Sequence, residues 1–307
     1  MIPTAPSDFR SGFIALIGRP NVGKSTLMNQ LIGQKVAITS AVAQTTRNRL
    51  RGILTRDDAQ IVFVDTPGIH KPHHSLGEIL VKNAIASINA VDLVLFVVDG
   101  SVAVGKGDQF IETILRRSQV PVWLGLNKTD LAPEDPLARV AIDNGYKAMA
   151  AAHEWPTCTF SAVTGDGLDP LLNQLIQTLP EGPYYYPPDL ITDRPERFIM
   201  GELIREQILE LTREEVPHSV AITIERVVEE AKITRILATI HVERPSQKAI
   251  LIGKSGLMMK EIGSQARQQI QKLIVGKVYL ELFVKVQPKW RQSNLRLSEL
   301  GYRVEAD

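Results

Sequence analysis

The sequence has little of several features that would place a protein in a specialised class. It contains a single cysteine, Cys158, which excludes an internal disulfide and is typical of a reducing compartment. Its apolar runs are short: residues 91–98 contain Asp92 and fall far below the ~20 residues of a membrane-spanning helix. The first eight residues are polar and contain two prolines, so we expect no signal peptide and a cytoplasmic protein.

No excess of charge points to a partner either, since the formal net charge is +1. With 44% hydrophobic and 22% charged residues, the composition is ordinary for a globular protein. The length of 307 residues allows two domains, each long enough to bury its own core.

The most informative segment is residues 18–25, which read GRPNVGKS and fit the pattern G-x-x-x-x-G-K-[ST]. An apolar run of strand length precedes it at residues 13–17, and residues 26–32 carry apolar side chains at helical spacing. Strand, glycine-rich loop and helix in this order predict a loop that binds nucleotide phosphates through its backbone N–H groups. We expect Lys24 to reach the β- and γ-phosphates and Ser25 to ligate Mg²⁺. The predicted phosphate-binding residues are Gly18, Arg19, Pro20, Asn21, Val22, Gly23, Lys24, Ser25 and Thr26.

A second motif selects the base. Residues 121–126 are apolar and of strand length, and the tetrapeptide Asn-Lys-Thr-Asp follows them. The carboxylate of Asp130 can accept from guanine N1–H and the adjacent amine together, which adenine does not offer. A solvated turn is the alternative for such a tetrapeptide alone, but its position after a strand favours a guanine site. The predicted base-binding residues are Asn127, Lys128, Thr129 and Asp130, with Ser161, Ala162 and Val163 offering a backbone N–H to guanine O6.

Two further segments complete the phosphate end. The apolar run 61–64 ends in Asp65, Thr66, Pro67 and Gly68, where Asp65 fits a carboxylate that holds Mg²⁺ and the Gly68 N–H can meet the γ-phosphate. Between the two motifs lies Gln44-Thr45-Thr46-Arg47, in which one threonine can join the Mg²⁺ shell when the γ-phosphate is present. We favour Thr46, with Thr45 as the alternative. The predicted metal ligands are Ser25, Thr46 and Asp65, and the predicted catalytic residues are Lys24, Thr46, Asp65 and Gly68.

Ile69 stands where many GTPases have a glutamine that orients the attacking water. Its side chain forms no hydrogen bond, so we expect slow hydrolysis, and a GTP-binding module without useful turnover is a rival interpretation.

Asn21 could ligate K⁺ near the phosphates, or only bond within its own loop. His70, His73 and His74 resemble a metal cluster, but they follow Gly68 closely, and a mobile switch loop is the preferred interpretation.

The second half of the chain begins after a segment, residues 181–188, with three prolines and a glycine. Its three tyrosines could stack on RNA, although packing onto a domain is preferred. Beyond it the pattern predicts a helix at 202–211, strands at 219–224 and 234–240, an apolar turn at 249–252, a helix to about residue 274 and a strand at 277–284. With Gly253-x-x-Gly256 before the last helix, this order resembles a KH domain of the prokaryotic arrangement, whose GxxG loop clamps single-stranded nucleic acid. The predicted RNA-binding residues are Gly253, Lys254, Ser255, Gly256 and Lys260.

Charge supports an RNA partner. Residues 244–296 contain eleven Lys or Arg and only two acidic residues, as a phosphate-binding surface requires. A solvated basic face and an anionic membrane surface are the alternatives. Trp290, between Lys289 and Arg291, could stack on a base or cap the core.

Taken in order, GRPNVGKS, QTTR, DTPG, NKTD, SAV and the GxxG segment resemble the Era family of bacterial GTPases over nearly the whole chain. The resemblance implies an α/β P-loop GTPase domain with a mostly parallel sheet and helices on both faces, followed by a smaller α+β KH domain. The expected bounds are 1–181, a linker at 182–196, and 197–307. It also implies binding of GTP, GDP and Mg²⁺, 16S ribosomal RNA near its 3′ end, a role in 30S subunit biogenesis, and partial peripheral association with the inner membrane. We expect a monomer and no DNA partner.

Overall fold

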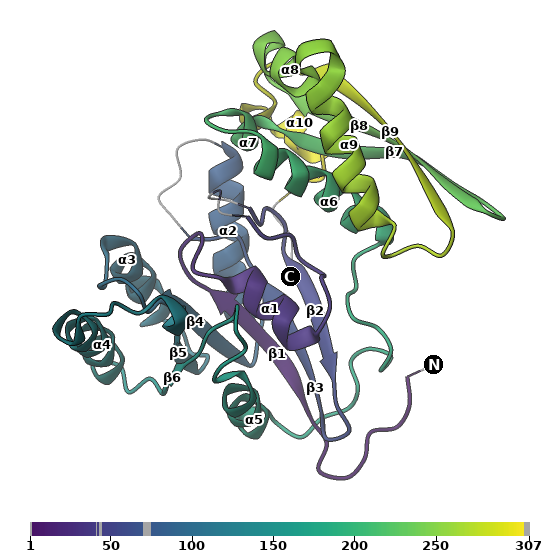
Figure 1. The fold of residues 1–307 in the computed structure, drawn as a ribbon. Coiled ribbons are helices and arrows are strands. Elements are labelled where there is room, and N and C mark those ends of the chain that lie inside the picture. The colour runs from purple at the N-terminus through teal and green to yellow at the C-terminus, as the bar shows by residue number, and fades with distance from the viewer. Residues whose placement is uncertain (1, 41, 43–44, 70–74, 304–307) are drawn as a thin grey trace.

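The computed structural model describes residues 2–40, 42, 45–69 and 75–303, and contains two β-sheets (Figure 1). The larger sheet belongs to the first part of the chain and the smaller sheet to the second. A mostly parallel α/β unit followed by a smaller α+β unit is the predicted fold class, which is confirmed.

The first sheet has the strand order β2-β3-β1-β4-β5-β6, and every described pair is parallel except β2 with β3. Its strands β1, β3 and β4 are near-continuous apolar runs because helices cover both faces of a parallel sheet. The strands are β1 (Arg10–Ile17), β2 (Leu50–Thr55), β3 (Ala59–Asp65), β4 (Leu93–Asp99), β5 (Val122–Asn127) and β6 (Thr157–Thr159). The helices between them are α1 (Lys24–Ile32), α2 (Ser75–Asn89), α3 (Lys106–Leu115), α4 (Pro136–Ala151) and α5 (Leu168–Thr178).

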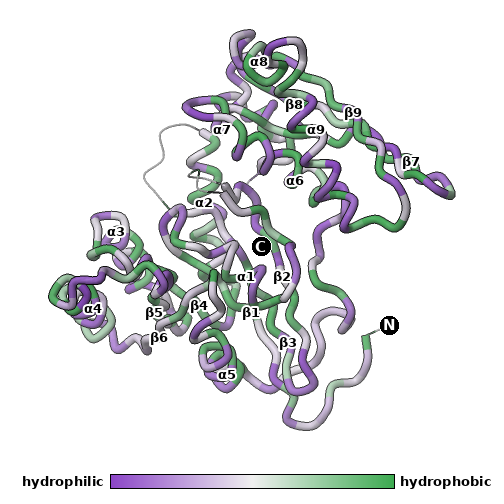
Figure 2. Tube along the Cα trace, viewed as in Figure 1, coloured by the Kyte–Doolittle hydropathy of each residue, from purple (hydrophilic) through white to green (hydrophobic). Residues whose placement is uncertain are grey.

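Alternate residues of the central strands enter two different hydrophobic clusters. Ile14 and Leu16 of β1 pack with α1 and α5, whereas Ala15 and Ile17 pack with α2, α3 and α4. Figure 2 shows hydrophobic residues along these strands and hydrophilic residues at the tip of the hairpin formed by β7 (Ala221–Glu230) and β8 (Ile233–Val242) in the second part of the chain. This layering leaves the carboxyl ends of the parallel strands as the edge where loops can form a site.

The second sheet has the order β7-β8-β9, antiparallel between β7 and β8 and parallel between β8 and β9. The strands are β7 (Ala221–Glu230), β8 (Ile233–Val242) and β9 (Lys277–Val286). The helices are α6 (Glu196–Leu211), α7 (Val216–Ser219), α8 (Pro245–Ile252), α9 (Leu257–Ile270) and α10 (Asn294–Glu299), with 3₁₀ turns η2 (Lys254–Gly256) and η3 (Trp290–Gln292). A further 3₁₀ turn, η1 (Thr129–Leu131), lies in the first part of the chain, between β5 and α4.

Two sequence-based predictions about this part were wrong in detail. Residues 249–252 are not an apolar turn but the last turn of α8, which starts with Pro245 in its first turn, where the missing N–H costs no helical hydrogen bond. The next helix, α9, ends at Ile270 rather than near residue 274, because Gln271 turns its side chain to the carbonyl groups of Ile274 and Gly276.

The proline-rich connector packs onto the first sheet, as preferred from the sequence. The rings of Tyr184 and Tyr185 lie 4.3 and 4.9 Å from those of Phe9 and Phe13. Buried Gln60 accepts from the N–H groups of Tyr185 and Tyr186 and donates to the Tyr186 carbonyl. These tyrosines are therefore engaged in the protein and not presented as a stacking surface.

The expectation of two separate cores is wrong at the junction of the two sheets. One hydrophobic cluster joins Val36 and Ile38, which follow α1, with Met200 and Leu203 of α6. A second joins Leu76 and Leu80 of α2 with Trp290, Leu297 and Tyr302 from the C-terminal segment. The two parts therefore share buried apolar surface on both sides of the segment that carries Thr46.

Candidate functional site

The phosphate-binding loop connects β1 to α1 at the carboxyl edge of the first sheet (Figure 1). Gly23, just before α1, has φ 96°, and a Cβ there would lie 2.3 Å from the Nδ2 atom of Asn127. A Cβ at Gly18 would lie 2.3 Å from the Val97 carbonyl oxygen. Only glycine therefore allows this loop to pack against the neighbouring strand ends, as a loop that bends backbone N–H groups toward one point requires.

Lys24 is 6% exposed and lies at the first position of α1. Its ammonium group donates to the carbonyl oxygens of Gly18 and Arg19, at 3.2 and 2.9 Å. Burial lowers the pKa of Lys24 to about 8, and the negative charge of Asp65 opposes that shift. A buried ammonium held only by carbonyl groups is suited to an anion, because phosphate oxygens would offset the cost of burying its charge.

Three oxygen atoms converge beside Lys24. The Ser25 hydroxyl donates to Asp65 Oδ2 at 2.6 Å, the Thr46 hydroxyl donates to the same atom at 3.2 Å, and the two hydroxyl groups are 2.9 Å apart. Asp65 Oδ1 is buried without a hydrogen-bond partner among the described residues. Burial raises the pKa of Asp65, opposed by Lys24 and the two hydroxyl groups. Hydroxyl and carboxylate oxygens at such spacing fit Mg²⁺, a hard cation that prefers oxygen ligands.

The two candidate threonines face opposite ways. Thr46 points to Ser25 and Asp65, whereas the Thr45 hydroxyl donates to the Val42 carbonyl of its own loop at 2.6 Å. The geometry therefore favours Thr46 as the hydroxyl on the metal side.

The segment after Asp65 packs against β1 and the phosphate-binding loop. Thr66 donates to the Leu16 carbonyl at 2.8 Å, and Gly68, after Pro67, packs so closely on the phosphate loop that a Cβ would lie 2.6 Å from the Pro20 nitrogen. Ile69 is 1% exposed and belongs to the hydrophobic cluster on the α2 face of the sheet. Its side chain points into the core and not to the phosphate site.

The phosphate-binding loop, the segment around Thr46 and Gly68 surround a small pocket. They line a pocket of about 50 Å³. The lining comprises Pro20, Asn21, Gly23, Lys24, Ser25, Thr26, Ile38, Thr39, Ser40, Thr45, Thr46 and Gly68. His70, His73, His74 and Gln44 lie outside the described residues.

The predicted base-binding residues lie at the ends of β5 and β6. Asn127 connects two loops, since it donates to the Val22 carbonyl and accepts from the Ala162 N–H, at 2.8 and 2.9 Å. The ammonium of Lys128 pairs with Asp99 at 2.7 Å, which fixes its stem at the site. Asp130, after Thr129, is exposed and accepts the Ser161 hydroxyl at 2.5 Å. That bond fixes the orientation of the Asp130 carboxylate through its Oδ1 atom, while the side chain stays exposed to a ligand.

In the second base-binding segment, residues 161–163, two backbone N–H groups already have acceptors within the protein. The Ala162 N–H already donates to Asn127, and the Val163 N–H donates to the Ser161 hydroxyl at 3.3 Å. The structure therefore brings both base-binding segments together, and the Asn127 side chain links them to the phosphate loop.

The GxxG segment joins α8 to α9 in the second domain. Gly253 and Gly256 have φ values of 70° and 78°, and a Cβ at Gly253 would lie 2.6 Å from that of Met258. Lys254 and Ser255 are exposed at the tip of the loop, and Ser255 also has a positive φ of 52°. The two glycines allow the positive φ values of this loop and have no side chain to cover its backbone, so a polymer chain can approach the backbone closely.

A groove of about 810 Å³ runs from this loop along α9 and the free edge of β9. Gly256 and Lys260 line it, as predicted, while Gly253, Lys254 and Ser255 form the loop at its end. The sequence-based prediction missed other lining residues, which are Lys248, Arg267, Tyr279 and Phe283. The sequence did contain a sign of the aromatic pair: Tyr279 and Phe283 are four residues apart on one strand, so they lie on the same face of β9. In the structure they are 48% and 52% exposed.

Two other candidate residues belong to the core. Trp290 is fully buried, donates to the Ser219 carbonyl at 2.9 Å and stacks on Tyr302, so the base-stacking alternative is wrong. Burial raises the pKa of the Cys158 thiol, which makes it a poor nucleophile.

Among the described residues, no helix combines the length and the apolar character needed to cross a bilayer.

Comparisons with known proteins agree with this geometry. The model of a family described as 50S ribosome-binding GTPases matches residues 13–128, and a KH-domain model matches residues 215–291. GTPase Era of Nostoc sp. is 69% identical over 304 residues, which cover 99% of this chain and 93% of that protein. GTPase Era of Leuconostoc citreum is 49% identical over 98% of this chain and 99% of its own length.

A solved structure has the same arrangement of both domains. A crystal structure of Era in complex with MgGDPNP and nucleotides 1506–1542 of 16S ribosomal RNA superposes with a TM-score of 0.91 at 37% identity. It covers 96% of this chain and 99% of that one. The P-loop, the guanine-type tetrapeptide, the GxxG groove and these full-length relatives show that this chain belongs to the Era family of GTPases.

Proposed function

We propose that this protein binds GTP with Mg²⁺, hydrolyses it slowly, and binds the 3′ region of 16S ribosomal RNA through its KH domain in 30S subunit biogenesis. The observation that carries the nucleotide half is the convergence of Lys24, the Ser25–Thr46–Asp65 oxygens and Asp130 at one edge of the first sheet. Related Era proteins crystallised with MgGDPNP and with GDP·AlF₄⁻ support the same assignment.

Each residue has a role that follows from its position. Lys24 offsets charge on the β- and γ-phosphates, and the Gly68 N–H donates to the γ-phosphate. Ser25, Thr46 and Asp65 would hold Mg²⁺, because their oxygen atoms converge at one point. Bound Mg²⁺ supplies charge stabilisation to the phosphates. Residues 18–26, 65–68, 127–130 and 161–163 bind the nucleotide, with Asp130 selecting guanine.

Slow hydrolysis follows from Ile69. Because that side chain is buried in the core, it contributes nothing to the orientation of the attacking water. Measurement of phosphate release over many turnovers tests this part, with Lys24→Ala as the control. We expect release that depends on Lys24 and is slower than about one turnover per second, the low end for typical enzymes. No release above the control would favour the rival, a GTP-binding module without turnover.

The RNA half rests on the KH groove. A groove that combines a glycine loop, three cationic side chains (Lys248, Lys260 and Arg267) and an exposed strand edge fits a single-stranded polyanion. The structure of Era with nucleotides of 16S ribosomal RNA supports the choice of RNA. Gly253, Lys254, Ser255, Gly256 and Lys260 are the proposed contact residues.

The competing ligand for this basic domain is an anionic membrane surface, and peripheral membrane association rests on the resemblance alone. Binding should be compared between an oligonucleotide with the 3′-terminal 16S sequence, a scrambled one, and phosphatidylserine vesicles. We expect the preference for the native sequence to persist at about 0.2 M salt, where contacts to phosphate alone weaken steeply. Equal binding of both oligonucleotides with stronger vesicle binding would favour the membrane alternative.

We also propose domain bounds at residues 1–181 and 197–307, with a linker at 182–196. The sheet membership of the strands supports this division, and α6 begins at Glu196, the last residue of the proposed linker. We propose a cytoplasmic monomer as its working form.

A further inference from the structure

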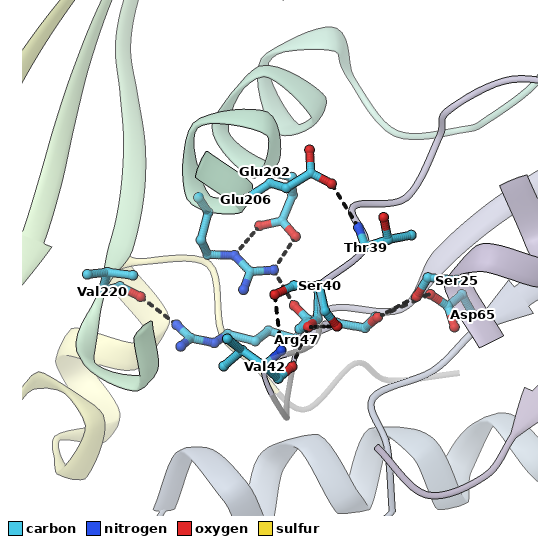
Figure 3. Close-up of polar contacts among 12 residues, drawn as sticks. Ser25, Thr39, Ser40, Val42, Arg47, Asp65, Glu202, Glu206 and Val220 are labelled. Carbon is cyan, nitrogen blue, oxygen red and sulfur yellow. Dashed lines mark hydrogen bonds and ion pairs between the residues drawn. The ribbon is translucent and has the colours of Figure 1, made fainter. Parts of the chain in front are cut away.

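The loop that carries Thr46 is held from the KH-domain side at both neighbouring residues. The guanidinium of Arg205, on α6, donates to the carbonyl of Thr45. On the other side of Thr46, Arg47 donates to the carbonyls of Val220, at 2.5 Å, and of Pro217 and His218, each at 3.2 Å. The Thr46 side chain itself points the opposite way, to Asp65. Figure 3 shows Arg47 reaching Val220, and Ser25 beside Asp65.

The beginning of the same loop is anchored by the next residue of α6. Glu206 accepts the Thr39 N–H at 2.9 Å and forms an ion pair with Lys35 at 2.6 Å. Glu206 is 1% exposed, so its carboxylate is shielded from water, whereas the side chain of its ion-pair partner Lys35 is 38% exposed. Three anchors thus tie Thr39, Thr45 and Arg47 to the second domain, and two of them come from consecutive residues of one helix.

The two arginine side chains that make these contacts are almost completely buried. Arg47 is 2% exposed and Arg205 is fully buried. Arg205 has one carboxylate partner, Glu202, at 2.5 Å, and its Nη1 atom has no hydrogen-bond partner among the described residues. Loss of a partner of a buried charge is costly, so the loop cannot leave this position without disrupting α6 contacts.

We propose that Arg205 and Glu206 are positioning residues for the GTP-bound state, which hold the Thr46 backbone so that its hydroxyl lies at the metal site. This inference rests on the proposed function. Since Thr46 would join the metal shell only beside a γ-phosphate, α6 raises the affinity for GTP over GDP. Linkage makes the effect reciprocal: GTP with Mg²⁺ stabilises the junction between the G domain and the KH domain by the same factor.

The test compares the affinities of the full-length protein for GDPNP and GDP, each with Mg²⁺ and with EDTA, by displacement of a fluorescent nucleotide. We expect Arg205→Met to weaken GDPNP binding by about tenfold in Mg²⁺, within the usual range of coupling between sites, and Glu206→Gln, which loses the ion pair with Lys35 but keeps an acceptor for the Thr39 N–H, to weaken it less. GDP binding should change less than about twofold, and the GDPNP loss should disappear in EDTA. Glu196→Gln and Arg197→Met, exposed on the same helix, are matched controls and should change neither affinity.

A double-mutant cycle identifies the route of the effect. Thr46→Val removes the hydroxyl, and if Glu206 acts through Thr46, the double variant should lose no more GDPNP affinity than Thr46→Val alone. Additive losses, or equal losses of GDPNP and GDP affinity, would overturn the inference. Glu206→Ala removes the acceptor of the Thr39 N–H and leaves Arg205 in place, so it tests the proposal if Arg205→Met does not fold. A parent protein that binds neither nucleotide would refute the proposed function, whereas an unchanged affinity ratio in folded variants would refute only this inference.

Discussion

Nucleotide binding should take up protons near pH 8, and Lys24 is the reason. Its free pKa is lowered to about 8 by burial, while Asp65 opposes the shift. Phosphate groups beside the ammonium favour its charged form and so raise its pKa in the complex. At pH 8 about half of the free protein has a neutral Lys24, so binding should take up about 0.5 proton per nucleotide. Affinity should be highest below pH 8 and fall toward about tenfold per pH unit above it.

Isothermal titration calorimetry of GDP at pH 8, in two buffers with different ionisation enthalpies, measures this uptake. EDTA should be present, so that metal binding displaces no proton from Asp65. Asp65→Asn provides a sharper check, since the Asp65 charge raises the Lys24 pKa. Its loss should leave more neutral Lys24 at pH 8 and increase the uptake. An uptake below about 0.1 proton in the parent, or a smaller uptake in the variant, would show that burial does not control Lys24.

Three other predictions follow from the same sites. Asp130→Asn should bind XTP better than GTP in competition assays, because an amide can donate to the 2-oxo group of xanthine; unchanged GTP affinity would remove Asp130 from the base site. Gly253→Asp with Gly256→Asp should abolish RNA binding by the full chain without loss of GTP binding, since carboxylates repel phosphate and the first also crowds Met258. If Asn21 ligates K⁺, GTP turnover should be faster in KCl than in NaCl at equal ionic strength, and Asn21→Ala should lose that difference; equal rates in the parent would exclude the role.

The nucleotide motifs could be predicted from the sequence because their chemistry is local. A loop such as residues 18–25 needs its glycines and lysine at fixed spacing, whatever the rest of the fold does. The choice between Thr45 and Thr46 needed the structure, because either side chain could face the metal until the loop was placed. The antiparallel edge strand β2 was missed, since Leu50–Thr55 is short and mixes apolar with polar residues.

The junction between the domains left no pattern in the sequence. Arg205 and Glu206 lie within a helix whose apolar spacing was visible, and charged residues at such positions usually form a solvated face. Both are buried in the folded protein, where they contact Thr39 and Thr45, residues far from α6 in the chain. Trp290 was ambiguous for the same reason, since Leu76, Leu80 and Tyr302 surround it only in the folded protein.

The central claim is that a GTPase domain and a KH domain act together on 16S ribosomal RNA. Ultraviolet crosslinking in cells, followed by sequencing of the attached RNA, tests it most directly, with the Gly253→Asp, Gly256→Asp double variant as control. The account predicts reads concentrated near the 3′ end of 16S ribosomal RNA that disappear in the double variant. Reads spread over all cellular RNA, equally in parent and variant, would contradict it.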